Sequence, residues 1–262
     1  MKAYQARKRF GQHFLRDRHV IGQIIEAMAL HASDHVVEIG PGQGALTREL
    51  ARRLSHFEAV EFDRDLIAPL QTEIGANKLS LHQADALKFD FCRLANHDRK
   101  LRLVGNLPYN ISTPLLFHLL AQARCIEDML FMLQKEVVLR LAAAPGNKDY
   151  GRLSVMIQYR CRVEKLFNVA PEAFSPPPRV ESSMVRLIPH STPPVEVKDE
   201  ATFAHVVRAA FASRRKTLRN NLKGLLDAAA MAAVDIDPTR RAETLSLAEF
   251  AALSNKTPPA PG

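Results

Sequence analysis

The chain alternates short apolar runs with helical patterns from about residue 36 to residue 138. Each run has the length of a strand, and the segments between the runs have the spacing of helices. Such alternation predicts a parallel sheet with crossover helices on both of its faces. Ligands bind such sheets just outside the carboxyl ends of the strands. The residues that follow each apolar run are therefore the candidates for function.

A glycine-rich turn follows the first of these runs. Residues 36–39 are followed by Gly40, Gly42 and Gly44 and then by a helical pattern. Glycine lets the backbone turn sharply and lets a ligand approach it closely. The G-x-G-x-G spacing is neither the G-x-G-x-x-G of a dinucleotide site nor that of a phosphate-binding P-loop. Taken alone, the turn is as consistent with an ordinary loop as with a ligand site.

Acidic residues end the next two runs. Glu61 follows residues 57–60 and lies 19 residues after Gly42, where a carboxylate can accept hydrogen bonds from both ribose hydroxyls. Asp85 follows the run at 79–82 and is a candidate acceptor for an adenine amine. Each acid alone is more often a solvated strand end. Their order along successive strands predicts a nucleoside-containing cofactor.

The tetrapeptide Asn106-Leu107-Pro108-Tyr109 closes a fourth run. An exocyclic amine is a poor nucleophile because its lone pair is delocalised into the base ring. The Asn106 side-chain carbonyl and the Leu107 backbone carbonyl would favour a pyramidal nitrogen by accepting its two N–H groups. Pro108 stiffens the turn, and Tyr109 offers a face on which an extruded base can stack. An ordinary Asn/Pro turn explains the tetrapeptide alone, but the upstream residues favour an S-adenosylmethionine site that faces an amine.

With these motifs, the chain resembles the small-subunit ribosomal RNA adenine dimethyltransferases of the KsgA type. The resemblance spans about residues 5–255, and further matches lie at residues 7–15, 132–137, 150–154, 174–180 and 214–219. It implies a Rossmann-like class I methyltransferase domain of the α/β class, with a mostly parallel seven-stranded sheet that ends in an antiparallel strand. A small all-α domain follows it.

The resemblance also implies the reaction and the partners. Two methyl groups pass from S-adenosylmethionine to the N6 amine of each of two adjacent adenosines near the 3′ end of 16S rRNA. The implied partners are small-subunit rRNA or an immature 30S particle, and the implied process is small-subunit biogenesis. Neither a metal nor a membrane is expected, and the protein is expected to be a cytoplasmic monomer.

The resemblance assigns roles residue by residue. Phe174 would be a second stacking face opposite Tyr109, so the catalytic set would be Asn106, Leu107, Pro108, Tyr109 and Phe174. The family usually has Asn where this chain has His13, whose ring can also donate and accept. The residues that would contact the cofactor are His13, Leu15, Gly40, Gly42, Glu61, Asp85 and Asn106.

Positive charge is concentrated in two short segments. Residues 1–18 carry six Lys or Arg against one Asp, and residues 205–223 carry six more without an acid. The two segments hold +11 and the whole chain holds +8, so the remainder is net −3. Such concentration suits a polyanion-binding surface, although a solvated face explains either segment alone.

The second basic segment has helical periodicity. Its apolar residues fall on one side of a helix, while Arg208, Arg215, Arg219 and Lys223 cluster within roughly 80° on another. Arg214 points toward the apolar side, where it should snorkel or meet an acid. A membrane-surface helix is the alternative, but the apolar side is needed for a small core. We expect RNA contacts from this ridge and from the first segment, namely Arg7, Lys8, Arg9, Arg208, Arg215, Arg219 and Lys223.

Composition excludes several classes of protein. No apolar stretch approaches the ~20 residues that span a bilayer, and the basic start of the chain lacks the apolar part of a signal peptide. Cys92, Cys125 and Cys161 are widely spaced and are expected to be reduced thiols. The ten histidines show no ligand spacing, and His118 is expected to be a core or interface residue.

Five segments are expected along the chain. They are a basic arm (1–18), the methyltransferase domain (19–190), a linker (191–198), a helical C-terminal domain (199–256) and a disordered tail (257–262).

Within these segments, helices are expected at about 20–30, 199–228, 238–244 and 246–254, the last with a capping box from Ser246 and Glu249. Residues 154–163 and 183–187 are expected to be strands, one of which runs against the sheet.

The expected mechanism is direct in-line methyl transfer without a covalent enzyme intermediate. Orientation and fixed acceptors should supply most of the rate, and no strong base is required because the methylated nitrogen is acidic. Two alternatives remain open. One is a large-subunit rRNA adenine methyltransferase, and the other is an RNA-binding assembly factor that acts without catalysis.

Overall fold

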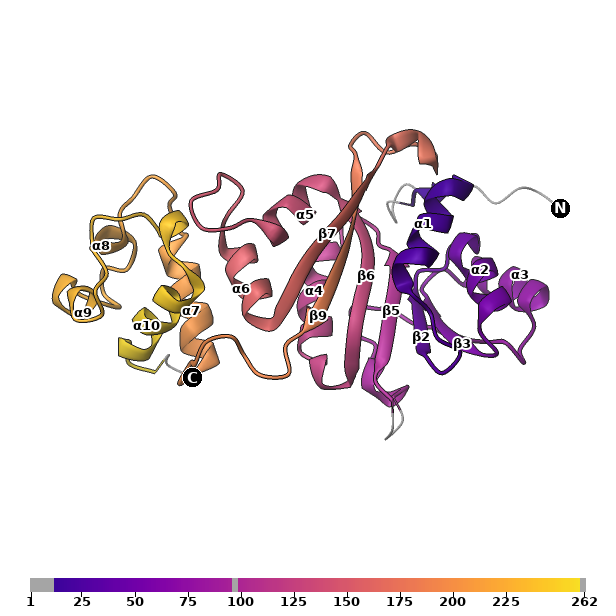
Figure 1. The fold of residues 1–262 in the computed structure, drawn as a ribbon, viewed down its shortest axis with the longest axis horizontal. Coiled ribbons are helices and arrows are strands. Elements are labelled where there is room, and N and C mark those ends of the chain that lie inside the picture. Colours follow the sequence, from indigo (N-terminus) through magenta and orange to yellow (C-terminus); the bar gives the residue numbers. More distant parts are fainter. Residues whose placement is uncertain (1–11, 96–98, 260–262) are drawn as a thin grey trace. The chain divides into compact units, whose positions relative to one another are not determined.

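The computed structural model describes residues 12–95 and 99–259. The chain divides into two compact units (Figure 1). The first comprises Met1–Val138 and Glu164–Pro189, and the second comprises Leu139–Val163 and His190–Gly262. Each unit has its own hydrophobic core.

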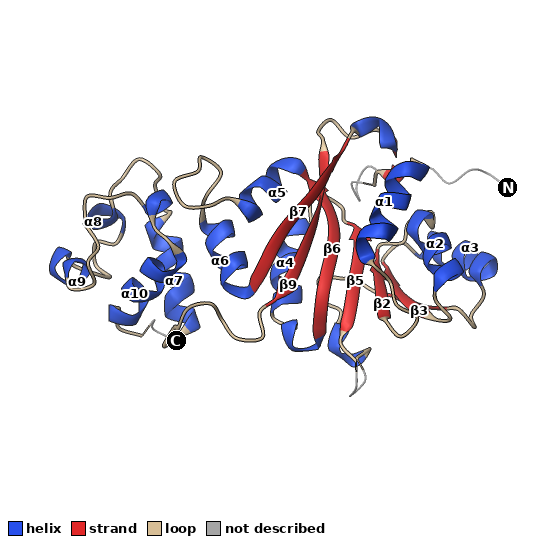
Figure 2. Ribbon diagram, viewed as in Figure 1, coloured by secondary structure: helices blue, strands red, loops and turns tan. Residues whose placement is uncertain are grey.

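The first unit is built on a seven-stranded sheet with the order β4-β3-β2-β5-β6-β9-β7 (Figure 2). Every pair from β4 to β6 is parallel, and β9 runs antiparallel to β6. The expected mostly parallel sheet with an antiparallel strand toward one end is therefore confirmed. The strands are β2 (His35–Ile39), β3 (Phe57–Glu61), β4 (Leu79–Gln83), β5 (Leu101–Asn106), β6 (Ile126–Gln134), β7 (Cys161–Val169) and β9 (Ser182–Pro189).

α-Helices connect β2 to β3, β3 to β4 and β5 to β6, as the alternating pattern predicted. Within the described part of the connection from β4 to β5, by contrast, there is only a short 3-10 helix (Phe91–Arg93). The apolar face of α2 packs on the sheet, where Leu46 and Leu50 share a core cluster with Val36 and Ala59. The helix expected at residues 20–30 is α1. The first five α-helices along the described chain are α1 (Arg18–Met28), α2 (Ala45–Arg53), α3 (Arg64–Ile74), α4 (Ser112–Leu120) and α5 (Lys135–Ala142).

A buried arginine ties the amino end of β5 to its surroundings. Arg102 donates two hydrogen bonds of 2.9 Å to the Asp128 carboxylate on β6 and one of 2.6 Å to Asp34 before β2. It also donates to the carbonyl of Met28 at 2.7 Å. Arg102 thus links a helix end and two strands through paired charges that are largely shielded from water.

The second unit differs from the expectation for residues 154–163. This stretch was predicted to be a strand, but α6 (Arg152–Arg160) is a helix and β7 begins only at Cys161. The alternating apolar pattern misled because Leu153, Val155, Ile157 and Tyr159 are all buried although they lie on different sides of the helix.

Residues 199–228 do not form the single helix that was expected. α7 ends at Ala210, and α8 begins only at Leu218. The Asn221 amide closes the turn by donating to the carbonyls of Ala210 and Ser213 at 2.7 and 2.9 Å. The basic ridge that was predicted on one helix is therefore spread over two helices and a turn. The remaining helices are α7 (Glu200–Ala210), α8 (Leu218–Asn221), α9 (Ala228–Ala232) and α10 (Leu247–Lys256).

Two finer expectations for the second unit are confirmed. The capping box of α10 forms between Ser246 and Glu249. Arg214 meets an acid, because its Nε lies 3.4 Å from the Glu243 carboxylate. No helix among the described residues is long and apolar enough to cross a bilayer.

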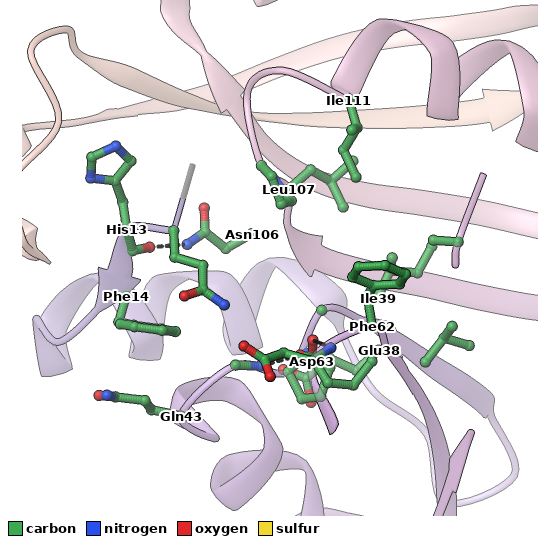
Figure 3. Close-up of a pocket in the computed structure, with 18 of the residues that line it drawn as sticks. His13, Phe14, Glu38, Ile39, Gln43, Phe62, Asp63, Asn106, Leu107 and Ile111 are labelled. Atoms are coloured by element: carbon green, nitrogen blue, oxygen red, sulfur yellow. Dashed lines mark hydrogen bonds between the residues drawn. The ribbon is translucent and has the colours of Figure 1, made fainter. Parts of the chain in front are cut away.

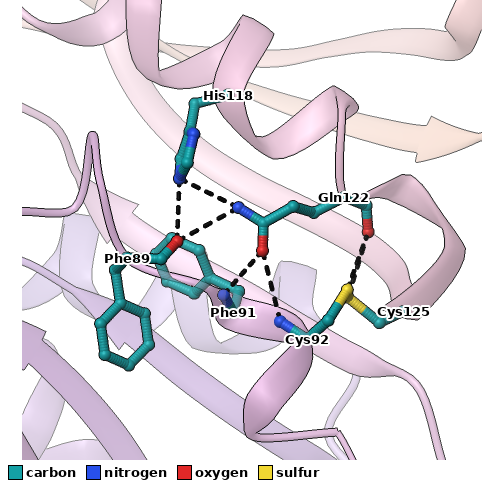
Figure 4. The surroundings of a disulfide bond; sticks show 6 residues. All are labelled: Phe89, Phe91, Cys92, His118, Gln122 and Cys125. Carbon is teal, nitrogen blue, oxygen red and sulfur yellow. Dashed lines mark hydrogen bonds between the residues drawn. A yellow bond between two sulfur atoms is a disulfide. The ribbon is translucent and has the colours of Figure 1, made fainter.

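The expectation of three reduced thiols is wrong. Cys92 and Cys125 form a disulfide, and only Cys161 is free (Figure 4). The Gln122 side-chain oxygen accepts from the backbone N–H groups of Phe91 and Cys92, which holds the short turn at Cys92 against the end of α4. The two cysteines lie 33 residues apart, and their spacing gave no sign of this tertiary contact.

We predict that Arg102→Met lowers the free energy of unfolding by about 3–5 kcal/mol, because it removes the hydrogen-bonded partner of the buried Asp128 and of the half-buried Asp34. Arg186, whose Nε lies 3.7 Å from Asp128, does not replace these bonds. Urea denaturation measures the change. Arg99→Met is the matched control, since Arg99 is exposed and donates one bond to Ser33; it should stay within about 0.5 kcal/mol of the parent protein. Equal losses in both variants would contradict a special role for the buried cluster.

Candidate active site

A pocket of about 280 Å³ opens at the carboxyl ends of the parallel strands (Figure 3). Residues from the ends of β2, β3 and β5, from the segment after β4 and from the segment around His13 line it. The structure brings most of the predicted site residues together here. The predicted residues that line the pocket are His13, Leu15, Gly40, Gly42, Glu61, Asp85, Asn106, Leu107, Pro108 and Tyr109.

The glycine turn needs its glycines. Gly40, Gly42 and Gly44 all have positive φ angles, of 69°, 56° and 81°, a region that residues with a Cβ rarely adopt. A Cβ built on Gly40 would meet no atom within 4 Å, so this backbone faces open space in the pocket. The turn can therefore receive a ligand against its main chain.

A further glycine, Gly105, brings β5 close to this turn. A Cβ at Gly105 would lie 2.4 Å from the carbonyl oxygen of Ile39, a distance that no side chain tolerates. Because Gly105 has no side chain, the end of β5 can approach the end of β2. Asn106 then comes into the same pocket as Gly40.

Glu61 supports the glycine turn from the end of β3. Its two carboxylate oxygens accept from the backbone N–H of Gly42 at 3.1 Å and of Asp63 at 2.8 Å. Burial raises the pKa of Glu61, and these backbone donors oppose the rise. Asp85 accepts from the N–H of Leu87 at 3.0 Å. Both carboxylates keep lone pairs for the hydroxyls and the amine of a nucleoside.

The Asn106 side-chain amide is hydrogen-bonded through its nitrogen. Its Nδ2 donates to the backbone carbonyl of His13 at 2.8 Å (Figure 3). Among the described residues, no donor is assigned to its carbonyl oxygen. The bond to His13 fixes the amide plane, and the side-chain oxygen can still accept a hydrogen bond.

The ring of His13 lies over Tyr109. The two ring centroids are 5.7 Å apart and the planes are inclined by 27°, while His13 Nδ1 contacts the carbonyl of Pro176 at 2.8 Å. The imidazole therefore covers one face of the phenol. A base that stacks on Tyr109 must use the other face or replace the imidazole.

Phe174 is not brought to the pocket. It belongs to the short strand β8 (Phe174–Ser175), which pairs antiparallel with β1 (Phe14–Leu15). Its side chain is 4% exposed and packs in the core cluster with Leu15. The sequence resemblance made it a second stacking face, but in this arrangement it supports the pocket wall from behind.

Sequence reasoning missed Glu38 and Phe62, which also line the pocket. Glu38 is buried inside β2, where Thr47 donates to it at 2.7 Å. Its position inside an otherwise apolar run of the sequence could have marked Glu38 as a candidate. Phe62 directly follows Glu61 and is 58% exposed, which is unusual for a ring of its size and marks a surface that a flat ligand can cover.

The predicted RNA-binding residues of the second unit lie on the surface. Arg208 is on α7, Arg215 in the turn and Arg219 on α8, with Lys223 just beyond it, and all four are exposed. Arg219 and Lys223 line a shallow groove that follows α8. Arg7, Lys8 and Arg9 lie outside the described residues.

Comparison with known proteins identifies the family. A sequence model described as ribosomal RNA adenine dimethylase matches residues 3–257. The chain belongs to this family. A ribosomal RNA small subunit methyltransferase A from Alcanivorax borkumensis is 55% identical over 99% of this chain and 93% of its own length.

Two solved structures, a dimethyladenosine transferase and an rRNA methyltransferase, have a similar fold. A dimethyladenosine transferase from Plasmodium falciparum aligns over 92% of this chain and 96% of its own, with a TM-score of 0.78 and 26% identity. The 23S rRNA methyltransferase ErmE aligns over 93% of this chain and 98% of its own, with a TM-score of 0.71 and 25% identity.

As a member of this family, the protein is an rRNA methyltransferase that uses S-adenosylmethionine. The pocket fits this cofactor, because an open glycine backbone and two carboxylates suit a nucleoside that bears an amino acid. No group of His, Cys, Asp or Glu side chains within residues 12–95 and 99–259 is arranged to hold a metal ion.

We predict that Gly105→Ala destabilises the fold by about 1–3 kcal/mol, because its Cβ must push β5 away from Ile39. It should also weaken the affinity for S-adenosylmethionine, as measured by calorimetry. The control is Gly22→Ala, whose Cβ would meet no atom within 4 Å and whose helical position favours Ala. An unchanged fold and affinity in Gly105→Ala would refute the close approach of the two strand ends.

Glu38 should make the stability of the protein depend on pH. Burial, with a smaller contribution from Glu61, raises the pKa of Glu38 from 4.5 to about 8, while Thr47 and Arg48 oppose the rise. The folded protein then holds this proton more tightly than the unfolded chain does. The stabilisation is complete below about pH 4.5 and is lost as the pH rises to about 8.

In this window the unfolding free energy of the parent protein should fall relative to that of Glu38→Gln by up to about 1.4 kcal/mol per pH unit. Denaturation of both proteins at several pH values measures the difference. A difference that stays constant between pH 5 and pH 8 would contradict the raised pKa.

Proposed function

We propose that this protein methylates the N6 amines of two adjacent adenosines near the 3′ end of small-subunit rRNA and so forms dimethyladenosines. The observation that carries this proposal is the position of Asn106. Asn106 lines the same pocket as the open glycine turn, and its amide nitrogen is bonded to the carbonyl of His13. The names of relatives that are 55% identical favour the small subunit as the source of the RNA.

We assign the cofactor to the part of the pocket around the glycine turn, which Gln43 marks in Figure 3. Gly40 and Gly42 would approach it with their backbone, Glu61 would accept the ribose hydroxyls, and Asp85 would accept the adenine amine. His13, Leu15 and Asn106 would close the site. When bound, S-adenosylmethionine supplies an electrophilic methyl group on a positively charged sulfur.

The protein's own residues prepare the amine. The Asn106 side-chain carbonyl and the Leu107 backbone carbonyl would accept the two N–H groups and so localise the lone pair on nitrogen. Pro108 holds the turn, and Tyr109 supports the base. After transfer the nitrogen is cationic and strongly acidic, so its proton leaves to water without a dedicated base. Acceptors fixed before the reaction lower the barrier because they need no reorganisation.

The likeness to ErmE supports a second candidate, an adenine methyltransferase of the large-subunit rRNA. Such an enzyme would share the pocket and differ in the RNA that it recognises. An assembly factor that binds RNA without catalysis is the third reading. Its support is weaker because Asn106, Glu61 and the glycine turn are all in place.

We place the RNA on the exposed cations of the second unit. Arg215, Arg219 and Lys223 have no ion-pair partner among the described residues, whereas Arg214 is held by Glu243. Exposed cations without such a partner are available to phosphates. Arg219 and Lys223 line one groove, which also contains the acid Asp227. We further propose that the protein is a cytoplasmic monomer and that its substrate is small-subunit rRNA, free or in an immature 30S particle.

Labelled S-adenosylmethionine tests the substrate directly. The protein is incubated with naked 16S rRNA, naked 23S rRNA or immature 30S particles, and the modified nucleosides are identified by mass spectrometry. Dimethyladenosine in small-subunit rRNA alone supports the proposal. Label confined to 23S rRNA supports the second candidate, and binding without label supports the third.

Asn106→Ala should lower turnover at least about 100-fold, because fixed polar groups at a reacting centre contribute on this scale. RNA affinity should stay nearly unchanged. Asn110→Ala is the matched control, since Asn110 is exposed and lines the same pocket. Near-normal methylation by Asn106→Ala would remove the basis of the proposed mechanism.

Arg215→Ala/Arg219→Ala should weaken RNA binding and reduce the slope of log affinity against log salt by about 1.4–1.8, the value for two lost phosphate contacts. Filter binding at several salt concentrations measures the slope. Arg52→Ala/Arg53→Ala removes the same charge from α2, where both residues pair with Glu49, and should leave the slope nearly intact. Equal slopes in both double variants would exclude this basic surface.

A further inference from the structure

Ser182 is a buried hydroxyl at the start of β9, with no measurable exposure. It pairs with Gln134 at the carboxyl end of β6. It therefore sits at the same edge of the sheet as the tetrapeptide that ends β5. None of the roles assigned above uses it.

Ser182 contacts the phenol of Tyr109. Its Oγ lies 2.7 Å from the Tyr109 hydroxyl, a good distance for a hydrogen bond between two hydroxyls. Burial raises the pKa of Tyr109, so the phenol keeps its proton at neutral pH and the contact joins two neutral groups. The two residues are 73 positions apart, so this bond fixes the turn after β5 to the first residue of β9.

The neighbouring Ser183 provides a contrast. It is equally buried, but its hydroxyl donates to the backbone carbonyl of Phe167 on β7 at 3.0 Å. Successive side chains of a strand point to opposite faces, so only one of the two serines can reach Tyr109. The two adjacent serines are thus equally buried, and each has one hydrogen-bonded partner. Only the partner of Ser182, Tyr109, lines the pocket.

The Tyr109 ring is held at two points. His13 covers one face, and Ser182 holds the hydroxyl at the tip. A ring that is fixed only by stacking can still tilt about its side-chain bonds, and the added bond at the tip removes this freedom. A fixed ring orients a base that stacks on it, and orientation of the reacting groups governs the rate of a transfer reaction.

We propose that Ser182 is a positioning residue, which sets the plane of the Tyr109 ring and through it the orientation of the target adenine. This inference rests on the proposed function, because it requires that the adenine stacks on Tyr109. The role is indirect, since Ser182 is buried and is not among the residues that line the pocket.

The test compares Ser182→Ala, Tyr109→Phe, the double variant and Ser183→Ala. Ser182→Ala and Tyr109→Phe should each lower kcat by between about twofold and tenfold, the range that corresponds to one hydrogen bond. The double variant should lose no more than either single variant, because all three lack the same bond. Affinity for S-adenosylmethionine should not change.

Ser183→Ala separates positioning from structure. It should lower the unfolding midpoint about as much as Ser182→Ala does but leave kcat within about twofold of the parent value. The inference would be overturned if the fold-loss of kcat in the Ser182→Ala/Tyr109→Phe variant equalled the product of the two single losses. It would also be overturned if Ser182→Ala and Ser183→Ala lowered kcat equally. If the parent protein itself forms no dimethyladenosine, the proposed function fails instead, so the two failures are distinguishable.

Discussion

The close approach of two strand ends governs the geometry of this protein's active site. β2 and β5 pair in parallel, and their carboxyl ends converge because Gly105 presents no side chain to the carbonyl of Ile39. One strand end carries the glycine turn that suits a cofactor, and the other carries the asparagine that suits the amine. The glycine turn and the Asn106 side chain therefore line one pocket.

Around this point, the polar groups of the site are already held by the protein. Glu61 is bonded to the backbone of the glycine turn, and Asn106 is bonded to the backbone of His13. Both residues line the pocket. Such preorganisation costs stability when polar groups are buried, as the raised pKa of Glu38 shows, and burial of this kind is typical of catalytic sites.

Much of the site was predictable from the sequence because it lies at strand ends. The four apolar runs predicted four of the parallel strands, and the polar residues at the ends of these runs lie at one edge of the sheet. Phe174 could not be placed in this way, since its burial depends on the pairing of two very short strands. In this pairing Phe174 lies opposite Leu15, which is 159 positions earlier in the chain. The disulfide and the contact of Ser182 with Tyr109 are likewise tertiary and leave no local pattern.

The helical parts were less predictable, for a related reason. Residues 153–159 alternate like a strand but form a helix that is buried on several sides. The break after Ala210 is made by a side chain eleven residues further on. In both cases, the structure is decided by contacts with residues that lie outside the short stretch of sequence from which the prediction was made.

The bond between Asn106 and the carbonyl of His13 spans 93 positions of the chain. It makes the backbone at His13 a support for the Asn106 side chain. A substitution that shifts this backbone would consequently shift the amide as well, although the two residues are remote in the sequence.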